Sequence, residues 1–330
     1  MGKNKSGTNA QSAAEFSISA WWRIGKRTYF KMQKDNLPLI AAGVGFYFLL
    51  AIFPFLAGVI SLYGLIVTPE QLSAHMTFLI NFLPQESRYI LQEQLEHLIS
   101  NTSGALGTGV IVSFMLTIWS SSKGANALIT ACNITYSESE GRSFLGSIIA
   151  RLVLTVAIIV AVIVALIFIT VLPKLITIVS GYKLSDSVAN WITWPILLVM
   201  FNTGLAALYR YSPHRANAKW RWVTPGSTVA TIFWIIFSFA FSYYLREFAS
   251  YNKTYGSVGG IIILLMWFYL SAYIILLGAE FNSAMEYQTE KDSTTGEAEP
   301  KGERGAYVAD HSPNDSEAPP SEDNKIQKAQ

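Results

Sequence analysis

The sequence contains few charged residues, and they are unevenly distributed along the chain. Charged side chains make up 14% of the 330 residues, whereas soluble domains carry roughly 25%. Between Asp35 and Glu280 the carboxylates occur only in or beside short polar segments, and eleven of the 22 acidic residues follow Glu280. A soluble protein of this length would spread its charges over its whole surface. The composition therefore excludes an ordinary soluble domain and indicates a protein embedded in a membrane.

Residue types that form disulfides, metal sites and nucleophilic sites are also scarce. Cys132 is the only cysteine, which excludes an internal disulfide and a cysteine-cluster metal site. The four histidines are scattered, and no hydrolase, nucleotide-binding or zinc-protease motif is present. We therefore expect no catalytic residues, no metal and no cofactor, and interpret the protein as not being an enzyme. The N-terminus also lacks the apolar core of a cleaved signal peptide.

What the sequence does contain is long apolar runs without charge. A membrane-spanning helix needs about 20 predominantly apolar residues, because its backbone must satisfy its own hydrogen bonds in the hydrocarbon. Six runs meet this requirement, so the sequence predicts an all-α membrane bundle of six transmembrane helices. The predicted spans lie between Asp35 and Glu70, from His97 to Ser122, after Arg151, from Val188, from Trp222 to Leu245, and within residues 251–283.

The distribution of Lys and Arg predicts the orientation of these spans. The two residue types gather before the first span, between the second and third, and between the fourth and fifth, while the other connections hold fewer. Cytoplasmic connections carry the excess of Lys and Arg, so both termini are expected in the cytoplasm. We predict a disordered N-terminus over residues 1–15, a six-span membrane domain over 16–286, and a disordered acidic tail over 287–330.

Two segments outside the spans are predicted to be amphipathic helices at the membrane surface. The segment that begins at Phe16 mixes aromatic and basic residues, and would lie on the cytoplasmic leaflet with its cations on lipid phosphates. Its place beside a span favours anionic lipid over nucleic acid as its partner. The second segment would cover the outer face and carries an amphipathic spacing at Leu91, Leu95, Leu98 and Ile99.

Three polar residues inside the predicted spans form the candidate site. A charged group within a membrane is costly, so it usually faces the protein interior or a water-filled cavity. The third helix would enter the membrane near Gly146 and the sixth would leave it near Met285, so Arg151 and Glu280 each lie about 7 Å inside the membrane, in the same leaflet. Asn202, in the fourth span, falls somewhat deeper. We hypothesise a polar vestibule open to the cytoplasm in which Arg151 and Glu280 pair or face one another. The alternative is that Arg151 extends to the headgroups while Glu280 only hydrogen-bonds to neighbouring helices.

Helix-breaking residues within the spans leave two interpretations open. Pro54 and Pro195 lie inside predicted spans, and Gly259 and Gly260 lie near the start of the last one. Proline removes a backbone donor and kinks a helix. Such interruptions occur around the binding sites of transporters, and they also occur in purely structural bundles. The pattern therefore does not separate transport from a structural role.

Four segments resemble the YihY/BrkB family of bacterial inner-membrane proteins. The resemblance covers roughly residues 20–285 and implies six helical spans with cytoplasmic termini. Gly278, Ala279 and Glu280 match the family's LGAE ending, and the YN-x-x-YG pattern at Tyr251, Asn252, Tyr255 and Gly256 matches its entrance to the last span. The four segments are LIAAGVGFYFLLAIFPFL, WSSSKGANALITACNITY, LYRYSPHRANAKWRWVTPGS and SYNKTYGSVGGIIILLMWFYLSAYIILLGAEFNS.

The resemblance and the polar residues together favour transport. Members of the family have carried the name ribonuclease BN, and a role in transport or lipid export has been suggested for them. We expect a protein that moves a lipid or another amphipathic substrate: Arg151 would hold an anionic headgroup, Glu280 would orient Arg151 or exchange a proton, and Asn202 would supply hydrogen bonds.

Two alternatives are a membrane scaffold that recruits envelope partners and, without any metal or acid cluster to support it, a ribonuclease. The expected partners are membrane lipids, with no nucleic acid. The substrate, the direction and energy source of transport and the oligomeric state are left open by the sequence.

Overall fold

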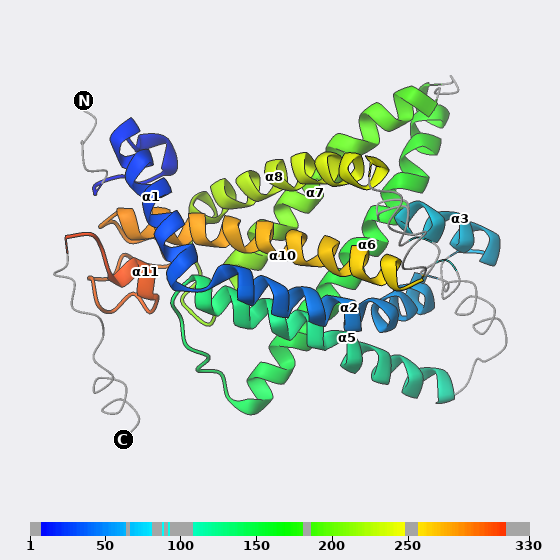
Figure 1. The fold of residues 1–330 in the computed structure, drawn as a ribbon, viewed down its shortest axis with the longest axis horizontal. Coiled ribbons are helices and arrows are strands. Elements are labelled where there is room, and N and C mark those ends of the chain that lie inside the picture. The colour runs from blue at the N-terminus through cyan, green and yellow to red at the C-terminus, as the bar shows by residue number, and fades with distance from the viewer. Residues whose placement is uncertain are drawn as a thin grey trace.

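The computed structural model describes residues 8–63, 67–80, 88, 92, 108–180, 186–247 and 257–314. These residues are predominantly α-helical and contain no β-strand, which confirms the predicted all-α class. The elements (Figure 1) are the 3-10 helix η1 (Ala13–Glu15) and the α-helices α1 (Ile18–Lys34), α2 (Leu37–Tyr63), α3 (Pro69–Ile80), α5 (Thr108–Thr135), α6 (Phe144–Ser180), α7 (Asp186–Tyr211), α8 (Trp220–Glu247), α10 (Ser257–Gln288) and α11 (Tyr307–Asp310).

Four of the described helices are long and apolar enough to cross a membrane. The helices α5 and α7 occupy the other two predicted positions and are 28 and 26 residues long, but they are not among the four. A helical membrane bundle is thus established, and the number of six spans stays a prediction. The four apolar stretches are Leu37–Ile60, Phe144–Ile169, Trp220–Leu245 and Gly259–Gln288.

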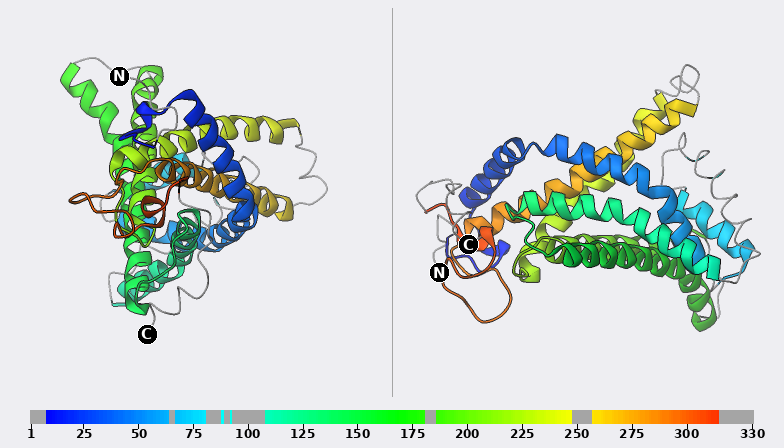
Figure 2. Two further views of the ribbon diagram at one scale, coloured as in Figure 1. Left: turned by 90° about the vertical axis from the view of Figure 1, so that its left-hand side faces the viewer. Right: turned by 90° about the horizontal axis from the view of Figure 1, so that it is seen from below.

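The six long helices form a closed ring. α2 packs on α5, α5 on α6, α6 on α7, α7 on α8, α8 on α10, and α10 on α2. α10 runs through the middle of Figure 1 between α2 and α8. The end-on and lower views in Figure 2 show α1 and α11 at the same end of this bundle. Consecutive helices are therefore neighbours in space, as in other helical bundles, and their facing sides enclose the interior.

The outward faces of the ring are apolar. Only 22% of the residues in the most apolar part of α6 are buried inside the protein, so most of them lie on its surface. Phe144 of α6 and Phe239 of α8 expose 85% and 75% of their surface. Large exposed apolar patches are rare on soluble monomers, and lipid chains remove the cost of exposing them. The surface therefore matches a hydrocarbon environment.

Glycines produce the closest contacts of α10. A Cβ on Gly278 would lie 2.6 Å from the carbonyl oxygen of Gly226 on α8, and a Cβ on Gly45 of α2 would lie 2.9 Å from the backbone nitrogen of Tyr269. Real Cβ atoms essentially never approach another heavy atom below 3.0 Å. Small residues allow membrane helices to touch along their backbones. The glycines of the quoted VGF, PGS and LGAE segments therefore have a packing role.

Helix α1 crosses the end of the bundle instead of continuing into α2. Asn36 has a φ of 52°, a left-handed conformation that Asn tolerates better than most residues, and the chain turns sharply there (Figures 1 and 2). Ile24 is buried against Trp222 and the end of α10, whereas Ile18 and Trp22 are 89% and 77% exposed. The predicted amphipathic helix is confirmed as a helix, and its location on the cytoplasmic leaflet stays a prediction.

The segments that flank the membrane domain pack together, in contrast to the disorder predicted for them. Arg304 is buried and donates to the backbone oxygens of Ala309 at 2.7 Å and Glu290 at 3.0 Å. Thr289 Oγ1 donates to the backbone oxygen of Ala10 at 2.6 Å, which joins the C-terminal segment to the N-terminal one. Disorder was predicted because these segments contain few apolar side chains. Composition gives no information about hydrogen bonds such as those between the Arg304 guanidinium and backbone oxygens.

Several predicted features lie outside the described residues. They are residues 1–7, residues 315–330, the YN-x-x-YG pattern, and the outer amphipathic helix apart from positions 88 and 92.

Candidate functional site

Glu280 is a fully buried carboxylate close to the end of α10. Its Oε2 lies 2.9 Å from Nζ of Lys31 on α1, although neither carboxylate oxygen meets hydrogen-bond geometry. The ammonium of Lys31 donates instead to Asp35 Oδ2 at 2.7 Å and to the backbone oxygen of Thr135 at 2.6 Å. An unpaired buried carboxylate would be strongly unfavourable. Lys31 therefore balances the charge of Glu280 and holds the ends of α1, α5 and α10 together.

The predicted pair between Arg151 and Glu280 is not formed. Their distance along each helix predicts that the two residues lie at similar depth, but it carries no information about the direction in which each side chain points. Because α1 folds back onto α10, it is Lys31, and not Arg151, that lies beside Glu280. The signal in the sequence was the placement of Lys31 and Asp35 four residues apart, directly before the first span.

Arg151 lies on α6 against an aromatic ring of α5. Its Cζ is 4.5 Å from the centroid of the Trp119 indole, a cation–π contact worth about 0.5–2 kcal/mol depending on desolvation. The residue is partly exposed, and its buried Nε has no hydrogen-bond partner. Arg151 is thus held in place while retaining the capacity to donate to an anionic group.

Asn202 joins α7 to α8. Its Nδ2 lies 3.3 Å from the hydroxyl oxygens of Thr228 and Thr231, and its Oδ1 accepts from Ser227 Oγ at 3.3 Å. Both the nitrogen and the oxygen of the Asn202 carboxamide are therefore hydrogen-bonded to α8. Over the described ranges, no hydrogen bond or ion pair joins any two of Arg151, Asn202 and Glu280, so they do not form one connected polar cluster.

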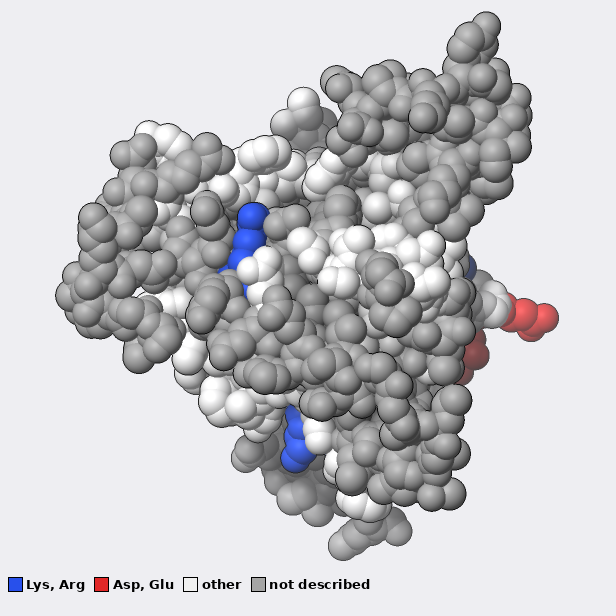
Figure 3. Space-filling view, turned by 90° about the vertical axis from the view of Figure 1, so that its right-hand side faces the viewer, with Lys and Arg blue, Asp and Glu red and all other residues white. Residues whose placement is uncertain are grey.

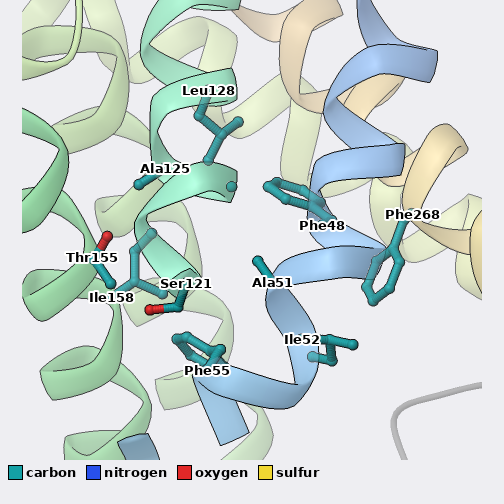
Figure 4. Close-up of a pocket in the computed structure, with 11 residues that line it drawn as sticks. Phe48, Ala51, Ile52, Phe55, Ser121, Ala125, Leu128, Thr155, Ile158 and Phe268 are labelled. Carbon is teal, nitrogen blue, oxygen red and sulfur yellow. The ribbon is translucent and has the colours of Figure 1, made fainter. Parts of the chain in front are cut away.

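An apolar cavity of about 170 Å³ lies between α2, α5, α6 and α10 (Figure 4). Aromatic rings such as Phe48 and Phe268 line it, together with aliphatic side chains. Ser121 and Thr155 supply its hydroxyl groups, and both donate to backbone oxygens of their own helices, at 3.1 and 2.7 Å. The cavity thus offers an apolar surface with two hydroxyls that are already satisfied.

Arg151 lies next to this cavity. Thr155, in the cavity wall, donates its hydroxyl to the backbone oxygen of Arg151, one helical turn away. The aromatic partner of Arg151, Trp119, lies two residues before the cavity residue Ser121. The backbone of Arg151 therefore adjoins the cavity wall, while its guanidinium lies on Trp119, which does not line the cavity.

A second buried ion pair, which the sequence reasoning missed, closes the end of the bundle near α1. Arg215, between α7 and α8, donates to both carboxylate oxygens of Glu286 at 2.8 and 3.1 Å, and neither side chain is exposed. Its Cζ lies 4.2 Å from the ring of Tyr136, and Ser293 Oγ donates to Glu286 at 2.9 Å. Burial would lower the pKa of Arg215, but the charge of Glu286 outweighs it and the pKa is raised. In the sequence Arg215 is recognisable only as one positive charge of a connection that is predicted to be cytoplasmic.

Within the part of the chain that the structure describes, no group of three His, Cys, Asp or Glu side chains is placed to hold a metal ion. The polar chemistry of the described bundle consists instead of buried ion pairs, cation–π contacts and satisfied amides.

Comparison with known proteins identifies relatives over most of the chain. Residues 28–302 match the family described as Virulence factor BrkB. The ribonuclease-like protein YfkH of Bacillus subtilis strain 168 is 33% identical over 259 residues, which cover 74% of this chain and 88% of that protein. UPF0761 membrane proteins of Tolumonas auensis and Idiomarina loihiensis are 24% and 26% identical, over 82% and 64% of this chain and 85% and 72% of theirs. No solved structure matches. The chain belongs to the Virulence factor BrkB family.

Proposed function

We propose that the protein is a six-span transporter of the bacterial inner membrane that moves or exports a lipid or another amphipathic substrate. The observation that carries this proposal is the apolar cavity of Figure 4, whose wall residue Thr155 contacts the backbone of Arg151 one helical turn away. An amphipathic molecule has an apolar part and a polar headgroup, and these two features would bind its two parts.

The distribution of cations supports an orientation with both termini in the cytoplasm. Lys31 contacts the end of α5, and the connection after α5 contacts the connection between α7 and α8 through Arg142 and the backbone oxygen of Ser212. The Lys- and Arg-rich segments therefore meet at one end of the bundle. Figure 3 shows the opposite end, where the described atoms in view are mainly uncharged. Because cytoplasmic segments carry the excess of Lys and Arg, the α1 end would face the cytoplasm.

The dimensions of the cavity suggest how a substrate would be held. Its volume of about 170 Å³ is smaller than the ~300–1,000 Å³ of typical small-molecule pockets. It would therefore accept part of an acyl chain, and a whole lipid would require the helices to separate. Arg151 would hold the anionic headgroup, Asn202 would supply hydrogen bonds once its contacts to α8 open, and Glu280 would exchange a proton or act through Lys31.

A lipid-translocation assay tests this function. The purified protein is reconstituted into liposomes that contain a fluorescent phosphatidylglycerol, and translocation is followed by chemical quenching of the outer leaflet. Arg151→Ala would remove a charge-assisted hydrogen bond to the lipid headgroup. The translocation rate should therefore fall about tenfold. The matched control is Arg221→Ala, which changes an exposed arginine of α8 that does not line the cavity, and it should keep the wild-type rate.

Three results would contradict the proposal. Equal rates for Arg151→Ala and wild type would remove Arg151 from the substrate path. Absence of translocation by wild type would favour the scaffold interpretation, and RNA cleavage that chelation abolishes would favour the ribonuclease.

A further inference from the structure

We propose that Arg210, at the end of α7, binds the phosphate of an anionic phospholipid in the leaflet around the α1 end of the bundle. Arg210 does not line the apolar cavity of Figure 4. It lies two residues before Ser212, whose backbone oxygen accepts a hydrogen bond from Arg142 at this end of the bundle. The site would bind lipid whether or not the protein transports a substrate, so the inference does not rest on the proposed function.

Two aromatic rings hold the guanidinium of Arg210. Its Cζ lies 5.2 Å from the centroid of the Tyr211 ring and 5.0 Å from that of the Trp220 ring, at the start of α8. The two rings contact each other edge to face, with their centroids 6.2 Å apart. Cation–π contacts orient a guanidinium without using its N–H groups. The rings therefore fix the position of Arg210 and leave its N–H groups able to donate.

Arg210 has no acceptor for these N–H groups in the described parts of the chain. No hydrogen bond or ion pair joins it to another residue there, and its Nε is buried without a partner. The side chain as a whole is partly exposed. A buried donor without an acceptor is unfavourable, and so is a partly buried charge without a counter-charge. An anion at the accessible side of the guanidinium would supply both the acceptor and the counter-charge.

The surroundings of Arg210 match a lipid rather than a water-soluble ligand. Tyr211 and Trp220 are 54% and 44% exposed, and Tyr and Trp gather at the headgroup level of membrane proteins. Val199, which is 65% exposed, lies on the same face of α7, about 17 Å towards the middle of the helix. Thr203, between them, donates its hydroxyl to the backbone oxygen of Val199 at 2.8 Å. An acyl chain would therefore lie along this face with its phosphate at Arg210.

The charge of Arg210 favours a headgroup with a net negative charge. In phosphatidylcholine the ammonium of the headgroup offsets the phosphate, so that the guanidinium would be balanced only in part. In phosphatidylglycerol the phosphate is the only charged group, and Arg can bind a phosphate with two parallel hydrogen bonds. The site should therefore prefer phosphatidylglycerol to phosphatidylcholine.

A different role for Arg210 is to stabilise the end of its helix. It is a basic residue in the last turn of α7, where a cation interacts favourably with the helix dipole. That role would affect the stability of the protein without distinguishing one lipid headgroup from another. Headgroup preference is thus the measurement that separates the two roles.

Native mass spectrometry of the full-length protein in detergent tests the site, because it resolves each bound lipid. The probes are dioleoyl phosphatidylglycerol, dioleoyl phosphatidylcholine and inorganic phosphate as a competitor. Wild type should bind one phosphatidylglycerol about tenfold more tightly than phosphatidylcholine. Arg210→Gln should remove this preference, because it removes a charge-assisted hydrogen bond, and Arg210→Lys, which keeps the charge but not the planar fork, should weaken it roughly threefold.

The matched control is Arg221→Gln, which makes the same charge change at an exposed arginine that has no contact with a described aromatic ring. It should change the affinity for phosphatidylglycerol less than about twofold, in line with the small effect of exposed charges. The comparison is repeated in Arg151→Ala protein, so that a lipid held by Arg151 is not counted. The result then stays distinct from that of the translocation assay.

Four outcomes would overturn the proposal. The first is an unchanged preference for phosphatidylglycerol in Arg210→Gln, whether or not that protein is less stable. The second is an equal loss in Arg210→Gln and Arg221→Gln, which would indicate attraction to any basic surface. The third is displacement of phosphatidylglycerol by inorganic phosphate, which would assign the site to a free phosphate compound. If Arg210→Gln does not fold, an unchanged preference in Arg210→Lys is the fourth.

Discussion

Gly278→Ala should destabilise the protein strongly, because there is no space for a methyl group where α10 meets α8. The added Cβ would lie 2.6 Å from the carbonyl oxygen of Gly226, 2.6 Å from Tyr209 Oη and 2.8 Å from Cβ of Ala230. None of the three neighbours is the free end of a flexible side chain. The Tyr209 hydroxyl is itself fixed, since it donates to the backbone oxygen of Ile275 at 2.7 Å. The two helices would therefore have to move apart.

The expected magnitude follows from two opposing effects. Overpacking of a dense core costs typically 1–3 kcal/mol, and the contacts around Gly278 put this site at the upper end, about 3 kcal/mol. Replacing Gly by Ala within a helix contributes about 1 kcal/mol in the opposite direction. The net loss in unfolding free energy is therefore about 2 kcal/mol, which reduces the ratio of folded to unfolded protein roughly thirtyfold.

Gly204→Ala on α7 is the matched control. A Cβ at Gly204 meets no atom within 4 Å, so only the gain in helix propensity remains, and this variant should be stabilised by about 0.5–1 kcal/mol. Both variants are unfolded by titration with sodium dodecyl sulfate in mixed micelles and followed by tryptophan fluorescence. Shifts of the two midpoints in the same direction would refute the packing explanation, as would a Gly278→Ala protein as stable as wild type.

Two further predictions concern carboxylates at the α1 end of the bundle. Glu286→Gln leaves the buried Arg215 without its counter-charge and should lower the unfolding free energy by about 3–5 kcal/mol. The control is Glu140→Gln, because the Glu140 carboxylate that pairs with Arg142 is 38% exposed. This substitution should lower the unfolding free energy by less than about 1 kcal/mol. Similar losses of unfolding free energy for Glu286→Gln and Glu140→Gln in the same titration would contradict the prediction. Burial raises the pKa of Glu138 despite the hydrogen bond from the Tyr307 backbone N–H. The folded protein then binds this proton more tightly than the unfolded chain, so the contribution of Glu138 is fully present below its ordinary pKa of about 4.3 and is lost as the pH rises through the raised pKa. The stability of wild type relative to Glu138→Gln should therefore fall as the pH rises from about 4 through the raised pKa, and a constant difference would contradict the assignment.

The apolar helices could be predicted from the sequence because the length of an uncharged run is a local property. The predicted spans around Leu37–Ile60 and Gly259–Gln288 coincide with apolar helices of the structure, and helix formation in hydrocarbon follows from the need to satisfy the backbone. The segment from Phe16 was likewise predicted as a helix from its residue pattern, and α1 begins at Ile18. The resemblance to the YihY/BrkB family could also be recognised from the sequence, because it depends on the order of residues within four short segments.

The candidate site was predicted only in part. Depth along a helix follows from the rise per residue, so the sequence placed Arg151 and Glu280 at comparable heights. It could not predict the rotation of each helix about its axis, nor that α1 would return across the end of α10. For that reason Lys31, rather than Arg151, is the partner of Glu280, and Asn202 contacts the hydroxyls of α8.

The sequence by itself determined that this is a helical membrane protein and which stretches are apolar enough to lie in lipid. Only the tertiary structure decided which ions meet, where the apolar cavity lies, and that residues 289–314 pack against the bundle. The physical reason is the range of the interactions. Burial of an apolar helix in lipid depends on its own residues, whereas an ion pair or a cavity requires atoms from segments far apart in the chain, whose meeting is set by the packing of the whole bundle.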